Sequence, residues 1–277
     1  MKKIAFIQDF FKEDLLGGAE NNDGNLINFL LKNNEVDMVY SYKTSPEELS
    51  IYDSIIVSNF IHLGEDSKKY LINEREYIIY EHDHKYVNTR DPSVFPNFII
   101  PSENIVNREF YQSSKEVVVL SKICKQVLEN TLPKTRVHSI GCSLWSDETF
   151  DYLSNLSQNP KNGKTCVMKS SNPIKNYPLA VKYCEKNNIS FDAISSNNTR
   201  EFLELMSSYS SFLFLPGVLE TYSRICAEAK MMDLQVITNK NKIGFFSEDI
   251  STLSGKDLIE KMKSRVHQAL LHFGELV

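Results

Sequence analysis

The sequence predicts an α/β protein built from two Rossmann-like domains, each with its own parallel sheet. Short runs rich in β-branched and aromatic residues alternate with segments of helical periodicity along almost the whole chain. Most of these runs are apolar at consecutive positions, as in parallel strands that helices cover on both faces. One polar stretch, at about residues 132–164, interrupts the alternation. This pattern excludes an all-β or an all-α fold.

Ten runs are predicted to be strands, six before the polar stretch and four after it. The segments between them repeat apolar residues at helical spacing, as at Leu26, Leu30 and Leu31. The predicted strands are Ile4–Ile7, Val36–Tyr40, Ser54–Val57, Tyr77–Tyr80, Phe98–Ile100, Val117–Leu120, Thr165–Met168, Phe191–Ile194, Phe212–Leu215 and Gln235–Thr238.

The polar stretch indicates a domain boundary near residue 145, because it is rich in Asn, Gly and Pro. Residues 1–145 would form the first domain and residues 146–277 the second. Residues 255–273 are predicted to be one long amphipathic helix near the domain junction. In open α/β sheets ligands bind at the carboxyl ends of the strands, so we expect the two sheets to face a central cleft.

Composition and charge exclude several classes of protein. The 277 residues are 42% hydrophobic, and no apolar run approaches the roughly 20 residues that cross a bilayer. The N-terminus lacks the pattern of a secretory signal, so we expect a cytoplasmic protein. A net charge of −5 leaves no broad basic field for nucleic acid. The five scattered cysteines form neither a zinc knuckle nor a disulfide framework.

The most informative segment is residues 212–230, where a buried strand is followed by a short loop and a predicted helix. Glu220 lies at the crevice between the strand and the helix, which is predicted to run from Thr221 to Met232. The first backbone N–H groups of that helix would point at any anion bound there. These N–H groups belong to Thr221, Tyr222 and Ser223.

A second carboxylate, Glu228, follows Glu220 by eight residues, about 12 Å along a helix axis. Two carboxylates at this separation suit two hydroxyl-bearing groups with a phosphate between them, which is the layout of a nucleotide-sugar. The alternative is an ordinary first-turn acid and a solvated helix residue. The apolar surroundings of Glu228, residues 225–229, favour a packed helix instead.

The pattern Glu220-x7-Glu228, after a strand that ends in Pro, resembles the E-x7-E motif of retaining GT-B glycosyltransferases of the family-4 type. Gly17-Gly18-Ala19-Glu20 is similar to the Gly-Gly-Ala-Glu loop of that family. Residues 137–142 correspond to its turn between domains, and residues 168–176 to the segment that carries its diphosphate-gripping Arg and Lys. The resemblance covers residues 4 to about 240.

The resemblance implies a GT-B fold and transfer of a hexosyl or pentosyl group from a nucleotide-sugar, with retention. It implies that Glu220 contacts the donor sugar, as a positioning and charge-stabilising residue, and that Glu228 binds the ribose hydroxyls. Lys169 and Lys175 would grip the diphosphate. The chain is shorter than typical members and departs from their pattern at three positions. These are Lys169 in place of Arg, Asn176 in place of Gly, and Met231-Met232-Asp233 in place of a glycine-containing run.

The paired glycines Gly17 and Gly18 follow the first strand across the loop Gln8–Leu16, and Asn25–Leu31 is predicted to be the next helix. Without a Cβ, backbone can approach a phosphate or sugar closely. Paired glycines are also common in plain loops. Their place after the first strand of a Rossmann-like sheet favours a donor-binding role.

Glu81-His82-Asp83-His84 also follows a predicted strand. A metal site would need further ligands at recognisable spacing, and the sequence offers no such cluster. The alternatives are a plain polar loop and a contact with donor sugar or acceptor. The resembled family carries a His, often His-Asp, at this place, so His82 is the catalytic candidate. The acceptor-side candidates are Asp83, His84 and Arg90.

Neither metal nor cofactor is expected, because Lys side chains and a helix N-terminus can neutralise a leaving diphosphate. The nucleotide-sugar is a substrate, and the acceptor is open: a glycan, a lipid, a small molecule or a modified DNA base. Two other readings remain: a noncatalytic nucleotide-sugar-binding protein of the same fold, and a viral-type DNA-base glycosyltransferase. The histidines outside the cluster are expected to have structural roles: His62, His138, His267 and His272.

Overall fold

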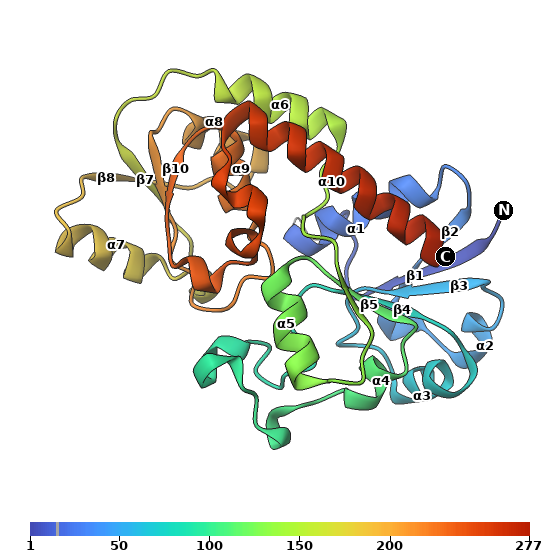
Figure 1. Cartoon of the computed structure of the whole chain (residues 1–277). Helices are drawn as coiled ribbons and strands as arrows, with labels where there is room; N and C mark the ends of the chain where they lie inside the picture. Colours follow the sequence, from blue (N-terminus) through green and yellow to red (C-terminus); the bar gives the residue numbers. More distant parts are fainter. Residues whose placement is uncertain (15–16) are drawn as a thin grey trace. The chain divides into compact units, whose positions relative to one another are not determined.

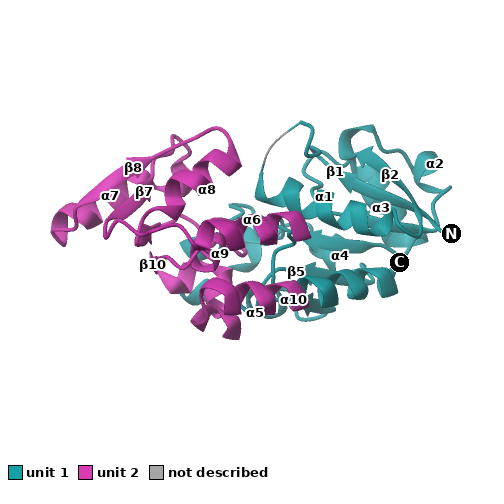
Figure 2. Cartoon of the chain, turned by 90° about the horizontal axis from the view of Figure 1, so that it is seen from above, with its two compact units in different colours: residues 1–145, 265–277 teal, residues 146–264 magenta. Residues whose placement is uncertain are grey.

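Two parallel sheets organise the chain in the computed structural model, which describes residues 1–14 and 17–277 (Figure 1). The chain divides into two compact units, coloured in Figure 2. Unit 1 comprises residues 1–145 and 265–277, and unit 2 comprises residues 146–264. The last residues of the chain, which we had expected in the second domain, therefore group with unit 1.

Unit 1 contains a six-stranded parallel sheet in the order β2-β1-β3-β4-β5-β6. Ile4 pairs with Val36 on one side and with Ser54 on the other, so chain order reverses between β1 and β3. The strands are β1 Lys3–Gln8, β2 Glu35–Tyr40, β3 Ser54–Val57, β4 Ile78–Glu81, β5 Glu116–Val119 and β6 Val137–Ser139. The helices are α1 Gly18–Leu30, α2 Pro46–Leu49, α3 Glu65–Glu74, α4 Arg108–Gln112 and α5 Lys122–Thr131.

One predicted strand of unit 1 is wrong. Residues 98–100 form no strand, because a 3-10 turn at Pro96–Phe98 interrupts the extended backbone. Asn97 and Phe98 have φ angles of 55° and 58°, in the left-handed region that a strand excludes. The sixth strand is instead β6, which the sequence analysis had read only as part of a turn. Three residues are too few to show a strand periodicity.

Helix α1 begins at Gly18, earlier than the predicted start at Asn25. The polar residues Asn22 and Asp23 interrupt the apolar periodicity of its first turns, so the sequence does not predict them as helical. Both residues are nevertheless buried. Asn22 Oδ1 accepts hydrogen bonds from Ser143 Oγ at 2.7 Å and from the Leu144 N–H at 2.6 Å. Buried polar groups are tolerated when they are bonded in this way.

Unit 2 contains a four-stranded parallel sheet in the order β10-β9-β7-β8. Its strands are β7 Thr165–Met168, β8 Phe191–Ile194, β9 Ser211–Leu213 and β10 Gln235–Ile237. Its helices are α6 Asp147–Ser157, α7 Tyr177–Lys186, α8 Thr199–Ser207 and α9 Arg224–Met231. Val167 and Leu213 of the sheet pack with Ala180 and Cys184 of α7 in one buried cluster.

The last helix, α10, runs from Gly255 to Leu276 and divides between the units at residue 264. Most of its apolar stripe is buried, with Leu258, Met262 and Phe273 fully enclosed and Leu270 partly exposed. In the part of the chain that the structure describes, no helix has the length and apolar character needed to cross a membrane.

Two helices of unit 2 end on left-handed residues that are not glycine. After α9, Asp233 has a φ angle of 65°, and Leu234 N–H donates to the Ala229 carbonyl at 2.9 Å. After α7, Asn188 has a φ angle of 52°, and Ile189 N–H donates to the Cys184 carbonyl at 2.9 Å. This is the Schellman arrangement, which usually contains glycine.

We expect the left-handed backbone at Asn188 to make this position sensitive to substitution. Asn188→Gly should be about 1–2 kcal/mol more stable than Asn188→Ala, because alanine is strained in this conformation and glycine is not. Urea denaturation followed by circular dichroism measures the difference. The same pair of changes at the exposed neighbour Asn187, whose φ is −101°, should not favour glycine. Equal stability of the two Asn188 variants would contradict the assignment.

Candidate functional site

The point at which strand order reverses in the sheet of unit 2 lies between β7 and β9. In open α/β sheets this switch point is where ligands bind, outside the carboxyl ends of the strands. The loop after β7 carries Lys169 and Lys175, and the loop after β9 carries Glu220. The topology thus places three of the predicted donor-site residues at the switch point.

Lys175 and Glu220 form an ion pair, with Nζ and Oε1 2.8 Å apart. Their side chains are 30% and 14% exposed, so the pair is partly shielded from solvent. The Lys175 ammonium also lies 5.6 Å from the centre of the Phe214 ring. An ammonium has three donors, so Lys175 can bind a phosphate oxygen while it remains bonded to Glu220.

Glu220 is held by its backbone rather than by a helix. Its N–H donates to the Lys242 carbonyl at 2.9 Å, and its carbonyl accepts from the Gly244 N–H at 2.9 Å. These bonds form an isolated parallel bridge to Ile243. The tertiary pairing fixes the direction of Glu220 before α9 begins.

The predicted helix start at Thr221 is wrong, because α9 begins at Arg224. Ser223 has a φ angle of 65° and is the residue before the helix, so Thr221 and Tyr222 lie outside it. The Cys226 and Ala227 N–H groups both donate to the Ser223 carbonyl, at 3.1 and 3.3 Å. The positive end of the helix dipole is therefore displaced toward Ser223 and Arg224.

Tyr222 is a core residue. It is 1% exposed, its ring lies 5.7 Å from that of Phe245, and its hydroxyl lies 3.6 Å from Met262 Sδ. Its side chain packs against Phe245 and Met262 and so anchors the loop between Glu220 and α9 to the core. Any donor contact by Tyr222 would have to come from its backbone.

Glu228 is buried in α9, with 4% of its surface exposed. The Arg224 Nε lies 3.7 Å from Glu228 Oε1, one helical turn away. The alternative of a solvated helix face is wrong for this residue. Because only the last part of the Glu220–Glu228 segment is helical, the expected rise of about 12 Å does not apply.

Two of the three departures from the resembled motif, Lys169 and Asn176, lie in the loop after β7. Asn176 has a φ angle of 51° and occupies the left-handed position where the resembled family has glycine. Asparagine tolerates this conformation, so the turn after Lys175 is preserved. Lys169 is exposed, and its backbone N–H donates to the Ile194 carbonyl at 2.8 Å.

In unit 1, Gly17 precedes α1 and Gly18 is its first residue. A Cβ built on Gly17 would lie 2.1 Å from Glu20 Oε2, so the Glu20 carboxylate folds back over Gly17. Burial raises the pKa of Glu20. The preceding loop includes residues 15 and 16, which lie outside the described residues. The paired glycines therefore form the N-terminus of α1, and a helix N-terminus is a position that favours anions.

His82 follows β4 and is oriented by Asp23, which the sequence analysis missed. His82 Nε2 lies 2.9 Å from Asp23 Oδ1, and Ser58 Oγ donates to Asp23 Oδ2 at 2.6 Å. All three residues are buried. Within residues 1–14 and 17–277, His82 Nδ1 has no hydrogen-bond partner. An Asp23 that accepts from Nε2 leaves Nδ1 as the ring's acceptor.

Glu81 belongs to a buried polar cluster below this histidine. Its Oε1 lies 3.1 Å from Lys85 Nζ, and its Oε2 accepts from the Tyr111 hydroxyl. Burial alone would raise the pKa of the Glu81 carboxyl. The Lys85 ammonium and the Tyr111 hydroxyl outweigh that effect, so this pKa lies below its usual value.

The three acceptor-side candidates have different environments. Asp83 and Arg90 form an ion pair at 2.5 Å. His84 is 2% exposed, and its Nδ1 lies 3.0 Å from the Tyr86 hydroxyl. Its ring is therefore part of the core. Arg90 remains exposed.

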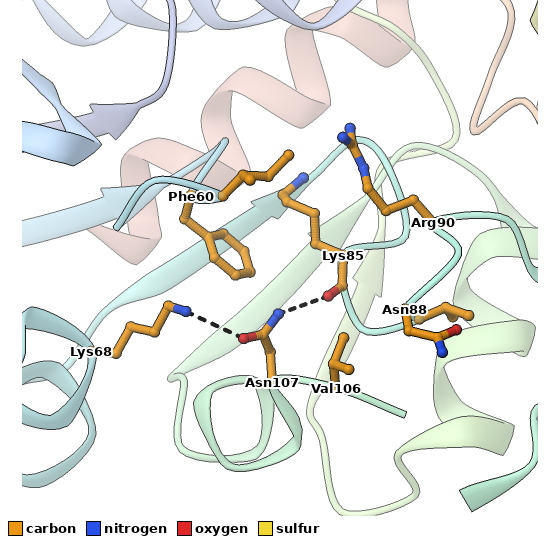
Figure 3. Close-up of a pocket in the computed structure, with 9 residues that line it drawn as sticks. Phe60, Lys68, Lys85, Asn88, Arg90, Val106 and Asn107 are labelled. Carbon is orange, nitrogen blue, oxygen red and sulfur yellow. Dashed lines mark hydrogen bonds between the residues drawn. The ribbon is translucent and has the colours of Figure 1, made fainter. Parts of the chain in front are cut away.

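A pocket of about 340 Å³ opens beside this cluster in unit 1 (Figure 3). Asn107 connects two of its walls, because its side chain accepts from Lys68 Nζ at 3.4 Å and donates to the Lys85 carbonyl at 2.9 Å. Of the predicted residues only Arg90 lines it. The lining consists of Phe60, Ile61, Lys68, Lys85, Val87, Asn88, Arg90, Val106 and Asn107.

No family model and no curated protein matches this sequence. Solved structures do match its fold. Sucrose-phosphate synthase from Thermosynechococcus elongatus superposes with a TM-score of 0.62 at 10% identity, over 100% of this chain and 98% of the other. Anabaena Alr3699/HepE, in complex with UDP and glucose, gives 0.52 at 11% identity, over 99% and 100%.

A third structure is an alpha-glucosyltransferase in complex with UDP and a 13-mer DNA containing an HMU base. It has a TM-score of 0.50 at 12% identity and covers 97% of this chain and 92% of its own. Matches of this kind define the fold, and the chain has the GT-B fold of these glycosyltransferases. The expected architecture of two Rossmann-like parallel sheets is confirmed.

We expect Glu81→Gln to destabilise the protein by roughly 3–5 kcal/mol at pH 7, because Lys85 would be left buried without its carboxylate. The lowered pKa of Glu81 means that its contribution is present above about pH 4.5 and lost as pH falls through the folded-state pKa. Thermal unfolding between pH 7 and pH 3 should therefore show a steeper loss for the wild type than for the variant.

The matched control for this experiment is Glu129→Gln. Glu129 pairs with Lys125 on an exposed helix face, at 3.7 Å. Its removal should cost less than about 1 kcal/mol. If Glu81→Gln were no more destabilising than Glu129→Gln, the buried pair would not carry the stability assigned to it.

Proposed function

We propose that this protein is a glycosyltransferase that moves a hexosyl or pentosyl group from a nucleotide-sugar to an acceptor hydroxyl, with retention and without a metal. The observation that carries the proposal is the Lys175–Glu220 pair at the switch point of the unit 2 sheet, with Glu228 buried in the next helix. The fold shared with a structure that holds UDP and glucose supports a UDP-sugar as donor.

On the donor side, Lys175 and Lys169 neutralise the diphosphate together with the N-terminal end of α9. Glu228 accepts hydrogen bonds from the ribose hydroxyls, and Glu220 positions the sugar. The bond from the anomeric carbon to the diphosphate breaks, and a bond to the acceptor oxygen forms. The acceptor proton leaves to the diphosphate or to a base. Charge on the leaving group is thus met by fixed cations and dipoles.

In unit 1, His82 contacts the acceptor. Asp23 acts as its positioning residue, because it fixes the tautomer and the ring direction. The pocket beside Lys85 and Arg90 is the acceptor site of this proposal. Its three cations are each paired with a carboxylate, so an anionic group of the acceptor would compete with Glu65, Glu81 and Asp83 for them.

A modified DNA base is the second candidate acceptor. It is supported by the fold shared with the glucosyltransferase that holds DNA, and by the three cationic side chains that line the pocket. These are Lys68, Lys85 and Arg90. An affinity for DNA that falls steeply with salt would support this acceptor. Nucleotide-sugar binding with neither transfer nor hydrolysis would indicate the noncatalytic reading instead.

We expect Glu228→Gln to weaken UDP binding by roughly 10- to 150-fold, the value of a charge-assisted hydrogen bond. Glu220→Gln should leave UDP binding nearly unchanged, because Lys175 can bind the phosphate with or without its bond to Glu220, and should lower sugar transfer. Calorimetry with UDP and a turnover assay measure the two effects. The exposed Glu260→Gln is the matched control. Equal, small effects of both changes would refute the donor-site assignment.

We expect His82→Gln to lower kcat by roughly 10- to 150-fold, the value of a hydrogen bond to a charged group, because the ring contact with the acceptor is lost in the transition state. Asp23→Asn should lower kcat by a smaller factor, while the KM for the donor stays unchanged in both variants. His62→Gln alters an exposed histidine of the same unit and should be silent. A raised donor KM with unchanged kcat would assign Asp23 and His82 to binding rather than to transfer.

A further inference from the structure

Two strands and the last helix of unit 1 bring one carboxylate and two imidazoles together. Glu116 belongs to β5, His138 to β6 and His272 to α10. One ligand atom from each residue lies within 4.8 Å of the other two. We infer that these three residues form a binding site for a divalent transition metal, with Zn²⁺ as the reference ion. The sequence analysis had read both histidines as structural and expected no metal.

Two imidazoles and a carboxylate are a ligand set that zinc uses in proteins, with a solvent molecule as the fourth ligand. Ligand atoms around a tetrahedral zinc ion lie about 3.4 Å apart, given bonds of about 2.1 Å. The observed spread of up to 4.8 Å therefore needs side-chain rotations to close by little more than about 1 Å. No movement of the strands is required.

Neighbouring side chains hold the Glu116 carboxylate in an orientation suited to metal binding. Its side chain is only 3% exposed, and its two oxygens have different neighbours. Oε2 lies 3.1 Å from Arg136 Nε, and Oε1 lies 2.5 Å from His272 Nε2. Arg136 thus holds the carboxylate from outside and leaves Oε1 directed toward the histidines. Outer-shell partners of this kind orient metal ligands in proteins.

The two histidine rings are stacked, with centroids 3.8 Å apart and an angle of 21° between their planes. Because the lone pair of an imidazole nitrogen lies in the plane of its ring, one of the two stacked rings must rotate before both can bind the same ion. Both histidines are half-buried, so an ion can reach the site from solvent.

The site would have a structural consequence for unit 1. Its ligands are far apart in sequence, and only His272 comes from α10. A bound ion would therefore fasten the end of this helix to the edge of the six-stranded sheet. Binding to the folded state alone raises stability. The site involves none of the residues proposed for sugar transfer.

The test is metal binding by chelator-treated protein, measured by calorimetry with Zn²⁺ and by the visible absorption of bound Co²⁺. We expect one tight site and a raised melting temperature in the wild type. His272→Gln should weaken Zn²⁺ binding at least about tenfold and remove the Co²⁺ absorption. His267→Gln, an exposed histidine of the same helix, should bind as the wild type does.

His138→Gln provides a second variant at the sheet edge, should the change at His272 impair folding. Circular dichroism establishes that each variant is folded before titration. Loss of the site in either folded histidine variant, with His267→Gln unaffected, supports the inference. Absence of Zn²⁺ binding to the wild type overturns it, as does equal binding by wild type and both variants.

Discussion

Parallel strand pairing is the constraint on which the rest of this structure depends. Because every strand of a sheet runs in the same direction, the loops that follow the strands emerge at one edge. In unit 2 this brings Lys175 and Glu220 together across 45 positions of sequence, in a 2.8 Å ion pair. In unit 1 it places the residues after β3 and β4 beside the start of α1. The loops that carry Lys175, Glu220 and His82 therefore all follow the carboxyl ends of strands.

Unit 1 carries charged and polar groups in its interior, and the buried carboxylates of Asp23 and Glu81 are matched by specific donors. The Asp23 carboxylate is hydrogen-bonded to His82 and Ser58, and the Glu81 carboxylate is hydrogen-bonded to Lys85 and Tyr111. Burying such groups is unfavourable unless they are paired. The pairing also restricts the side chains to one orientation. Asp23 thus fixes the direction of the His82 ring.

The short loops of unit 2 rely on residues other than glycine in left-handed conformations. Asn176 turns the chain after Lys175, Ser223 precedes α9, and Asp233 ends it. Asparagine and aspartate tolerate this conformation because their side chains bond locally. Asn176 and Asp233 are also positions at which the chain departs from the resembled motif in residue type. The loop after β7 and both ends of α9 are built in this way.

The sequence by itself determined the alternation of strands and helices, the two sheets and the loops that carry Lys175, Glu220 and His82, because apolar periodicity and motif spacing are local properties. Tertiary structure decided the rest. It placed β6 at residues 137–139, where three residues show no periodicity, and began α9 at Arg224, where a left-handed Ser223 replaces the expected first turn. It also paired Asp23 with His82 and gathered Glu116, His138 and His272. Contacts between residues this far apart depend on how strands and helices pack, and no local pattern encodes that packing.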